Sequence, residues 1–148
     1  MIHHIGQFNC FCHISGFPKV SYVDEKAVIS DGVHIGPFCV VGPGVKLGSN
    51  VKLVAQVNLS GTTIIGNDCK LYPFVSMGHP PQDMKHKGGE VSIEIGERCT
   101  FRENVNIHPG VDYGKPVTRI GNDCYFISLL ISKILFCVFK YLVFLINP

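Results

Sequence analysis

The sequence has 148 residues, enough for one domain of ordinary size and short for two. Thirteen lysines and arginines against eleven acidic residues leave a formal charge of +2, which argues against a protein that binds nucleic acid or another polyanion. Apolar residues make up 46% of the chain and charged residues only 16%, so the composition excludes intrinsic disorder and predicts a buried core.

Residues 1–19 form an N-terminal extension that does not share the pattern of the rest of the chain. This segment has no basic region followed by an uninterrupted apolar stretch, so it does not predict a secretory signal. With seven cysteines in such a chain, we expect a cytoplasmic protein with reduced thiols. Ligand-type residues gather here without the paired C-x2-C spacing of structural zinc sites, and we expect no metal at His3, His4, Cys10, Cys12 and His13.

Residues 20–124 carry a six-residue repeat. Cut every six residues from Ala27, the chain gives nine consecutive hexapeptides whose third position is apolar and whose first is small or β-branched. Glycine occupies the fourth position in five of the nine. The pattern breaks over 81–92, resumes in register at Ile93, and returns one residue out of phase at Thr118, which predicts a bulge around 111–117.

A period of six fits a triangular solenoid in which each hexapeptide forms one short strand and one corner. The first and third positions then face the same side, as the two-residue period of a strand requires. Glycine at the fourth position, with Asn or Asp nearby, would supply the corner conformations. The sequence therefore predicts an all-β parallel β-helix of about four to five coils rather than an antiparallel β protein with a chance period. The inward first position also predicts small buried hydrophobes at Cys39, Cys69, Cys99 and Cys124.

Four segments of the repeat region resemble the UDP-N-acetylglucosamine O-acyltransferases, a family of hexapeptide-repeat transferases. In order they are VHIGPFCVVGPGVKLG at 33–48, PPQDMKHKGGE at 80–90, IEIGERCTFRENVNIHPG at 93–110 and VTRIGNDC at 117–124. The resemblance covers roughly 20–124 and only the N-terminal portion of the family.

The resemblance implies a left-handed parallel β-helix that forms a homotrimer with active sites between neighbouring prisms. It also implies transfer of an (R)-3-hydroxyacyl chain from acyl carrier protein to the 3-hydroxyl of UDP-N-acetylglucosamine, in the first step of lipid A biosynthesis. In such a reaction a histidine acts as general base and a backbone amide stabilises the oxyanion of the thioester. No metal or organic cofactor is implied.

The resemblance assigns substrate binding to four residues. Gln82, Asp83 and Lys85 match the family's substrate-contacting loop, where a lysine offers a cation to phosphate and a carboxylate accepts hydrogen bonds from sugar or base. Without the resemblance, this loop would be taken as a solvated polar excursion from the helix. His108 matches a histidine that lines the family's cleft, although Pro109 stands where the family usually has arginine.

Other polar residues carry weaker expectations. His79 and His86 have no family match and are expected at the surface. Arg102 and Glu103 resemble an arginine–glutamate pair of the family, for which structural support and substrate contact remain equally open.

The family's catalytic histidine is missing from this sequence. Counted forward from VTRIGNDC without a gap, its position falls at Ile134, and a second active-site histidine falls at Ile131. No histidine follows His108 in the chain. Because a general base typically contributes about 10²–10⁴-fold to the rate, we expect no catalytic residue here and activity near background.

Residues 125–148 form an apolar tail without hexapeptide period or glycine. One interpretation is a helix at a membrane interface, with Lys133 and Lys140 on one face. The other is a frameshift, a premature stop or a retained non-coding stretch, which the abrupt change at Tyr125 favours over membrane contact.

Three functions are therefore compatible with the sequence. The first is the N-terminal part of the acyltransferase, related to that activity by descent but deficient as written. The second is a non-enzymatic β-helical fragment that binds nucleotide-sugar or co-assembles with an intact copy. The third is a sugar acetyltransferase that uses acetyl-CoA, against which the QDMK segment at 82–85 argues.

Overall fold

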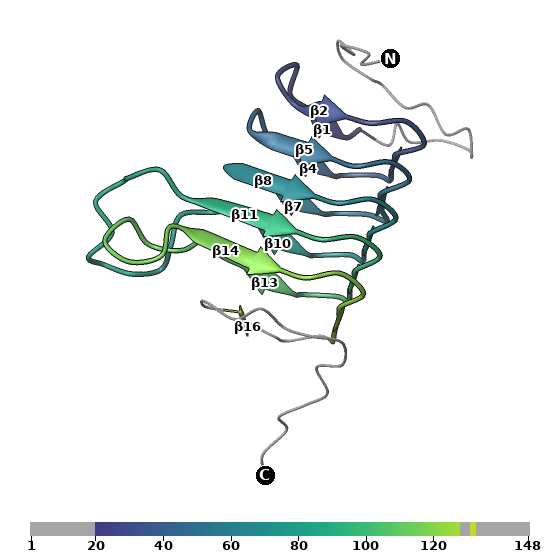
Figure 1. The fold of residues 1–148 in the computed structure, drawn as a ribbon. Coiled ribbons are helices and arrows are strands. Elements are labelled where there is room, and N and C mark those ends of the chain that lie inside the picture. The colour runs from purple at the N-terminus through teal and green to yellow at the C-terminus, as the bar shows by residue number, and fades with distance from the viewer. Residues whose placement is uncertain (1–19, 128–130, 133–148) are drawn as a thin grey trace.

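The computed structural model describes residues 20–127 and the backbone of 131–132. The predicted N-terminal extension at 1–19, position Ile134 and most of the predicted apolar tail lie outside the described residues. None of the described residues belongs to a helix that could cross a membrane. The described chain forms short strands stacked along one axis, with the N-terminal coil at one end (Figure 1).

The strands make three parallel sheets, which we call faces A, B and C. Face A contains β1 (Tyr22–Val23), β4 (Val40–Val41), β7 (Asn58–Leu59), β10 (Ser76–Met77), β13 (Asn106–Ile107) and β16 (Ile131–Ser132). Face B contains β2 (Val28–Ile29), β5 (Val45–Leu47), β8 (Thr62–Ile65), β11 (Ser92–Ile95) and β14 (Val117–Ile120). Face C contains β3 (His34–Ile35), β6 (Lys52–Leu53), β9 (Lys70–Leu71), β12 (Thr100–Phe101) and β15 (Tyr125–Phe126).

Consecutive strands lie on different faces, and each strand pairs in parallel with the strand that comes three earlier in the chain. Val41 of β4 pairs with Leu59 of β7, eighteen residues later, and Leu53 of β6 pairs with Leu71 of β9 at the same spacing. Three hexapeptides therefore complete one coil, which confirms the predicted parallel β-helix.

The core follows the predicted inward positions. Third-position residues such as Leu47 and Leu59 are 0–1% exposed, and so are first-position residues such as Val51. Thr63 takes a first position and is fully buried, but its hydroxyl donates to the carbonyl oxygen of Ser60 at 2.8 Å, so burial leaves no polar group unpaired.

The inward cysteines are buried free thiols, as predicted: Cys39, Cys69, Cys99 and Cys124. Burial raises the pKa of the Cys39 thiol, whereas a hydrogen bond from Cys99 lowers that of Cys69. Enclosed between neighbouring coils, these side chains act as small core residues.

The corners differ from the prediction, because the left-handed backbone falls mainly on the sixth position, and among the described fourth-position glycines only Gly78 adopts it. A Cβ at Gly36, a fourth position, would lie 1.8 Å from the carbonyl oxygen of Val54 in the next coil, so glycine there allows close stacking. Asparagine and aspartate tolerate the left-handed region better than other side chains, and they hold four of the eight non-glycine positions. The eight residues are Phe38, Asn50, Gln56, Asp68, Phe74, Arg98, Asn104 and Asp123.

Two loops leave the helix at the same corner, between faces A and B. The 78–91 loop joins β10 to β11 and the 108–116 loop joins β13 to β14, and both project to the same side (Figure 1). Thr63 pairs with Ile93 thirty residues later, and Ile93 pairs with Thr118 twenty-five residues later, instead of eighteen. The predicted interruption and bulge are therefore confirmed, and neither one shifts the sheet register.

Two strands lie beyond Cys124, within the stretch predicted as an apolar tail. β15 pairs with β12, so that the rings of Phe101 and Phe126 stack with their centroids 4.8 Å apart. The backbone of Ile131, where the resemblance places a histidine, pairs with Asn106 of β13. The ladder of face A therefore continues through a sequence that lacks the hexapeptide pattern.

Candidate functional site

The 78–91 loop and the 108–116 loop pack against each other, and this contact places His108 beside the start of the segment that carries Gln82, Asp83 and Lys85. His108 is half-buried, and its Nδ1 lies 3.2 Å from the carbonyl oxygen of Pro80, two residues before Gln82. A carbonyl oxygen can only accept, so Nδ1 is the donor in this contact.

Asp83 connects the two loops a few residues further along. Its Oδ1 accepts a hydrogen bond from the Lys85 N–H at 2.9 Å, and its Oδ2 accepts one from the Tyr113 hydroxyl. The bond to Asp83 raises the pKa of Tyr113. One carboxylate therefore fixes both the local turn and its attachment to the next coil.

The other two predicted binding residues extend from this turn. The side chains of Gln82 and Lys85 are exposed, as is that of Met84 between them. An amide and an ammonium group are thus held on a fixed turn within reach of solvent, a combination that can bind the hydroxyls and phosphates of a polar ligand.

The second half of the 78–91 loop is held by Asp112. Its Oδ2 accepts hydrogen bonds from the backbone N–H groups of Lys87 at 3.1 Å and Gly89 at 3.2 Å, and its Oδ1 lies 3.3 Å from Nδ1 of His86. Burial acts to raise the pKa of Asp112, but the two N–H groups and the His86 ring bring it below its ordinary value.

The position of His86 corrects the prediction of a surface residue. Its side chain is only 11% exposed, because the ring is enclosed between the two loops and paired with Asp112. Sequence reasoning missed this pair, because the partners lie in separate loops outside the hexapeptide pattern. A histidine in the middle of a loop and an aspartate in the next loop gave no spacing that could have linked them.

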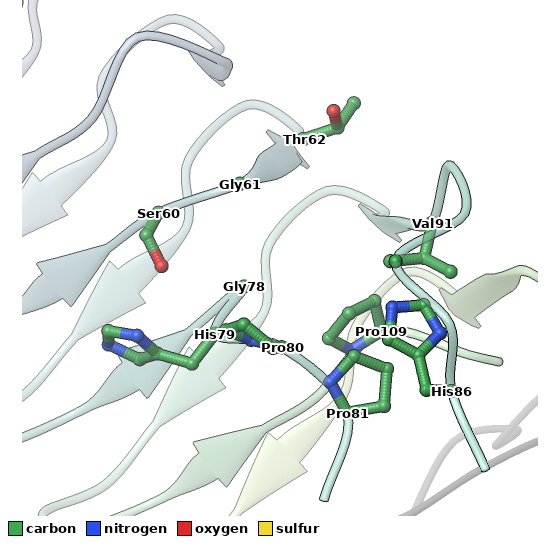
Figure 2. Close-up of a pocket in the computed structure, with 11 residues that line it drawn as sticks. Ser60, Gly61, Thr62, Gly78, His79, Pro80, Pro81, His86, Val91 and Pro109 are labelled. Carbon is green, nitrogen blue, oxygen red and sulfur yellow. The ribbon is translucent and has the colours of Figure 1, made fainter. Parts of the chain in front are cut away.

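A cavity of about 500 Å³ lies between the 78–91 loop and the corner of the preceding coil. Its volume falls in the range of small-molecule sites, roughly 300–1,000 Å³. Ser60 and Thr62 line one side, and the prolines and His86 line the other (Figure 2). The lining residues are Ser60, Gly61, Thr62, Gly78, His79, Pro80, Pro81, His86, Gly88, Val91 and Pro109.

The predicted binding residues do not line this cavity, although their loop forms one of its walls. Gln82, Asp83, Lys85 and His108 lie outside its lining, whereas Pro109, which stands where the resemblance leads us to expect arginine, is buried and belongs to it. The polar turn and the cavity are therefore separate features of the same loop.

Arg102 and Glu103 form an ion pair at the corner that follows β12 of face C. Nε and Nη2 of Arg102 donate to the two carboxylate oxygens at 3.0 and 3.1 Å, which lowers the pKa of Glu103. The guanidinium also lies over the ring of Tyr72, 4.4 Å from its centroid, and donates to the Tyr125 hydroxyl. These contacts tie neighbouring coils together, so structural support is the role that the geometry favours.

The site thus offers binding groups rather than an assembled set of catalytic groups. No group of three or more histidine, cysteine, aspartate or glutamate side chains in the described part of the chain could hold a metal ion. The candidate ligands at His3, His4, Cys10, Cys12 and His13 lie outside the described residues, as does Ile134. What this region can do is bind a polar, phosphate-bearing ligand at the Gln82–Lys85 turn.

Comparisons with known proteins point in one direction. Residues 26–61 match the family described as bacterial transferase hexapeptide (six repeats). The acyl-acyl-carrier-protein–UDP-N-acetylglucosamine O-acyltransferase of Azorhizobium caulinodans is 40% identical over 112 residues, which is 72% of this chain and 41% of the relative. That of Mesorhizobium japonicum is 43% identical over 108 residues, 73% of this chain and 39% of the relative.

Among solved structures, the UDP-N-acetylglucosamine acyltransferase of Bacteroides fragilis matches with a TM-score of 0.70 and 36% identity. The match covers 73% of this chain and 42% of that one. It confirms the predicted left-handed parallel β-helix of hexapeptide repeats. This chain therefore spans about two fifths of the length of the relatives that it matches.

Proposed function

This chain is a partial homologue of the UDP-N-acetylglucosamine O-acyltransferases, and we propose that it provides their nucleotide-sugar-binding part. In this proposal the ligand is UDP-N-acetylglucosamine, and the related reaction is transfer of an (R)-3-hydroxyacyl chain from acyl carrier protein to its 3-hydroxyl. That reaction is the first step of lipid A biosynthesis and uses no metal or organic cofactor.

The observation that carries the proposal is the turn at 82–85. It presents an amide, a carboxylate and an ammonium group at adjacent points, and the His108 contact with Pro80 fixes them against the helix. A lysine cation suits a diphosphate, while carboxylate and amide oxygens accept hydrogen bonds from sugar hydroxyls.

The same proposal predicts weak catalysis. The position of the family's general base holds Ile134, and a second histidine position holds Ile131. An isoleucine cannot take a proton from the sugar hydroxyl, so the acyl transfer rate should stay near background. Nucleotide-sugar binding, alone or in co-assembly with an intact copy, is then the function left to this chain.

Calorimetric titration with UDP-N-acetylglucosamine tests the binding. We expect Lys85→Ala to weaken the affinity about tenfold, because a charge-assisted hydrogen bond to phosphate is lost. Lys46→Ala is the matched control, since Lys46 is an exposed lysine on β5, away from the turn, and this change should leave the affinity unaltered. Absence of binding to the unaltered chain would refute the proposal, and binding of acetyl-CoA instead would favour a sugar acetyltransferase.

An acyl transfer assay with acylated acyl carrier protein as the donor tests the proposed loss of catalysis. Turnover of the purified chain at the rate of an intact acyltransferase would show that another residue acts as the base, and the proposed loss of catalysis would be wrong. A signal at background, with binding retained, is the expected result.

The proposal includes a homotrimer in a cytoplasmic setting. The described outward residues of face A are all uncharged, whereas faces B and C carry outward lysines. An uncharged face suits contact with further copies of the chain. The described cysteines are free thiols, in keeping with a reducing compartment. The face A residues are Tyr22, Val40, Asn58, Ser76 and Asn106.

A further inference from the structure

We propose that Asp112 is a positioning residue, which fastens the 82–90 segment to the next coil of the helix in the arrangement that presents Gln82 and Lys85. The identity of the ligand rests on the proposed function, but the fastening does not. Asp112 lies in the 108–116 loop, and the segment that it holds lies in the 78–91 loop of the preceding coil.

The contacts of Asp112 account for the second half of the segment. A single carboxylate accepts from the N–H groups of Lys87 and Gly89 and faces the His86 ring, so two backbone groups and one side chain of the same short stretch converge on it. Charge-assisted hydrogen bonds of this kind are shorter and stronger than neutral ones. The Asp112 side chain is only 21% exposed, which limits competition from water.

Gly89 is shaped to this contact. A Cβ at this position would lie 2.5 Å from the Cβ of Asp112, closer than two carbon atoms can approach. Glycine therefore lets the carboxylate reach the backbone N–H groups. Gly88, one residue earlier, has nothing within 4 Å of its Cβ position, so the close approach is specific to Gly89.

The loop that carries Asp112 forms a tight turn of its own. The Val111 N–H donates to the Lys115 carbonyl and the Gly114 N–H to the Val111 carbonyl, both at 3.2 Å. Asp112 and Tyr113 therefore sit together at the tip of a closed loop. A group on a turn fixed in this way can hold another segment in one place.

The first half of the segment is held from the same loop, by Tyr113 on Asp83 and by His108 on Pro80. Lys85 lies between these attachments and those of Asp112. The bond from its own N–H to Asp83 sets the local turn but does not join it to the helix. Loss of the Asp112 attachment would therefore free the segment on the C-terminal side of Lys85.

Site-specific proteolysis tests the proposal directly. Trypsin cleaves after lysine, and Lys85 and Lys87 both lie in the segment, so mass spectrometry of the fragments reports how often the segment opens. We expect Asp112→Ala to raise the cleavage rate at these two lysines about tenfold, because two charge-assisted hydrogen bonds are lost. Cleavage at Lys46 and Lys52, in the strands, should not change.

Conservative variants separate positioning from a general loss of structure. Asp112→Asn keeps an oxygen that accepts from the N–H groups but loses the charge, so we expect a cleavage rate between those of Asp112→Ala and the unaltered chain. Gly89→Ala should reproduce Asp112→Ala by pushing the carboxylate away. Asp31→Ala, which removes an exposed carboxylate outside the two loops, is the control that should change nothing. If Asp112→Ala unfolds the chain and exposes every tryptic site, the cleavage rates of Asp112→Asn and Gly89→Ala decide whether Asp112 positions the segment.

The affinity for UDP-N-acetylglucosamine, measured on the same variants, completes the test. Faster cleavage with about tenfold weaker binding in Asp112→Ala, both partly restored in Asp112→Asn, is the expected result. Unchanged cleavage overturns the proposal, and so does weaker binding without faster cleavage, because Asp112 would then contact the ligand itself. Faster cleavage in a chain whose unaltered form does not bind upholds the positioning and refutes the proposed function.

Discussion

At the scale of single residues, Gly78 occupies a crowded point where the 78–91 loop leaves the helix. Its φ of +83° lies in the left-handed region, and a Cβ there would stand 1.9 Å from the Ser60 carbonyl oxygen and 2.4 Å from Oγ1 of Thr63. Neither backbone nor a buried threonine in the core can move away at low cost. Both conformation and space therefore require glycine.

We expect Gly78→Ala to lower the free energy of unfolding by more than about 2 kcal/mol, because the added methyl must displace packed backbone. Gly88→Ala is the matched comparison, since its φ of +85° is similar but its Cβ position is open, and it should cost about 1 kcal/mol. Urea unfolding of the two variants measures the difference. Equal losses would mean that conformation alone, and not the close approach, selects glycine at 78.

Single residues also mark the limit of what the sequence could predict at the site. Gln82, Asp83, Lys85 and His108 are predicted as binding residues through the resemblance alone, and the structure brings their two loops into contact. The environment of His86 was not predictable, because its burial depends on how two irregular loops fold against each other. No periodic pattern constrains such loops, so only the folded structure shows which charged groups meet.

At the scale of elements, the last described coils are joined by an aromatic stack. Phe101 of β12 is fully buried and Phe126 of β15 is 3% exposed, with an angle of 11° between the rings. This contact closes the C-terminal end of the described core, where neighbouring coils are the only packing partners that a solenoid has.

We expect Phe101→Ala to lower the free energy of unfolding by about 3–5 kcal/mol, the usual loss for a buried phenylalanine that leaves a cavity. Phe74→Ala is the control, because Phe74 is 52% exposed at a corner and should lose less than about 1 kcal/mol. Thermal unfolding of both variants checks this. A small loss in Phe101→Ala would indicate that the end coils contribute little to the cooperative core.

The strands themselves were predictable, because each hexapeptide repeats the same inward pair of positions. The roles of the corner residues were not, since a glycine at the fourth position can reflect either a special conformation or close stacking. Gly36 allows close stacking, while the sixth position of the same hexapeptide, Phe38, takes the left-handed conformation that the repeat pattern predicted for glycine. The strands beyond Cys124 were missed because they lack the repeat pattern.

At the scale of the whole molecule, the three faces differ in charge. Face A has no charge among its described outward side chains, from Tyr22 through Asn106, while outward lysines stand on β5, β6 and β9 of the other two faces. Burying an unpaired charge in an interface is costly, so face A is the surface that further copies of the chain can cover at least cost.

We expect Ser76→Lys, in the middle of face A, to convert the proposed trimer into monomers. Light scattering coupled to size-exclusion chromatography measures the mass, which should fall from three times that of the chain to one. Thr100→Lys on face C adds the same charge to another face and should leave the mass unchanged. A monomeric unaltered chain, or dissociation by the face C variant alone, would contradict the assignment of face A.

The corner that carries the two loops has a practical consequence for engineering. Because of the two loops, paired residues of neighbouring face B strands lie thirty or twenty-five residues apart in the chain instead of eighteen. The hydrogen-bonded ladder nevertheless continues without a shift in register. Because the entropic cost of closing a loop grows only slowly with its length, a foreign peptide grafted at this corner would be displayed without disturbing the scaffold. New recognition could thus be installed on this prism by exchanging loops while every strand is left as it is.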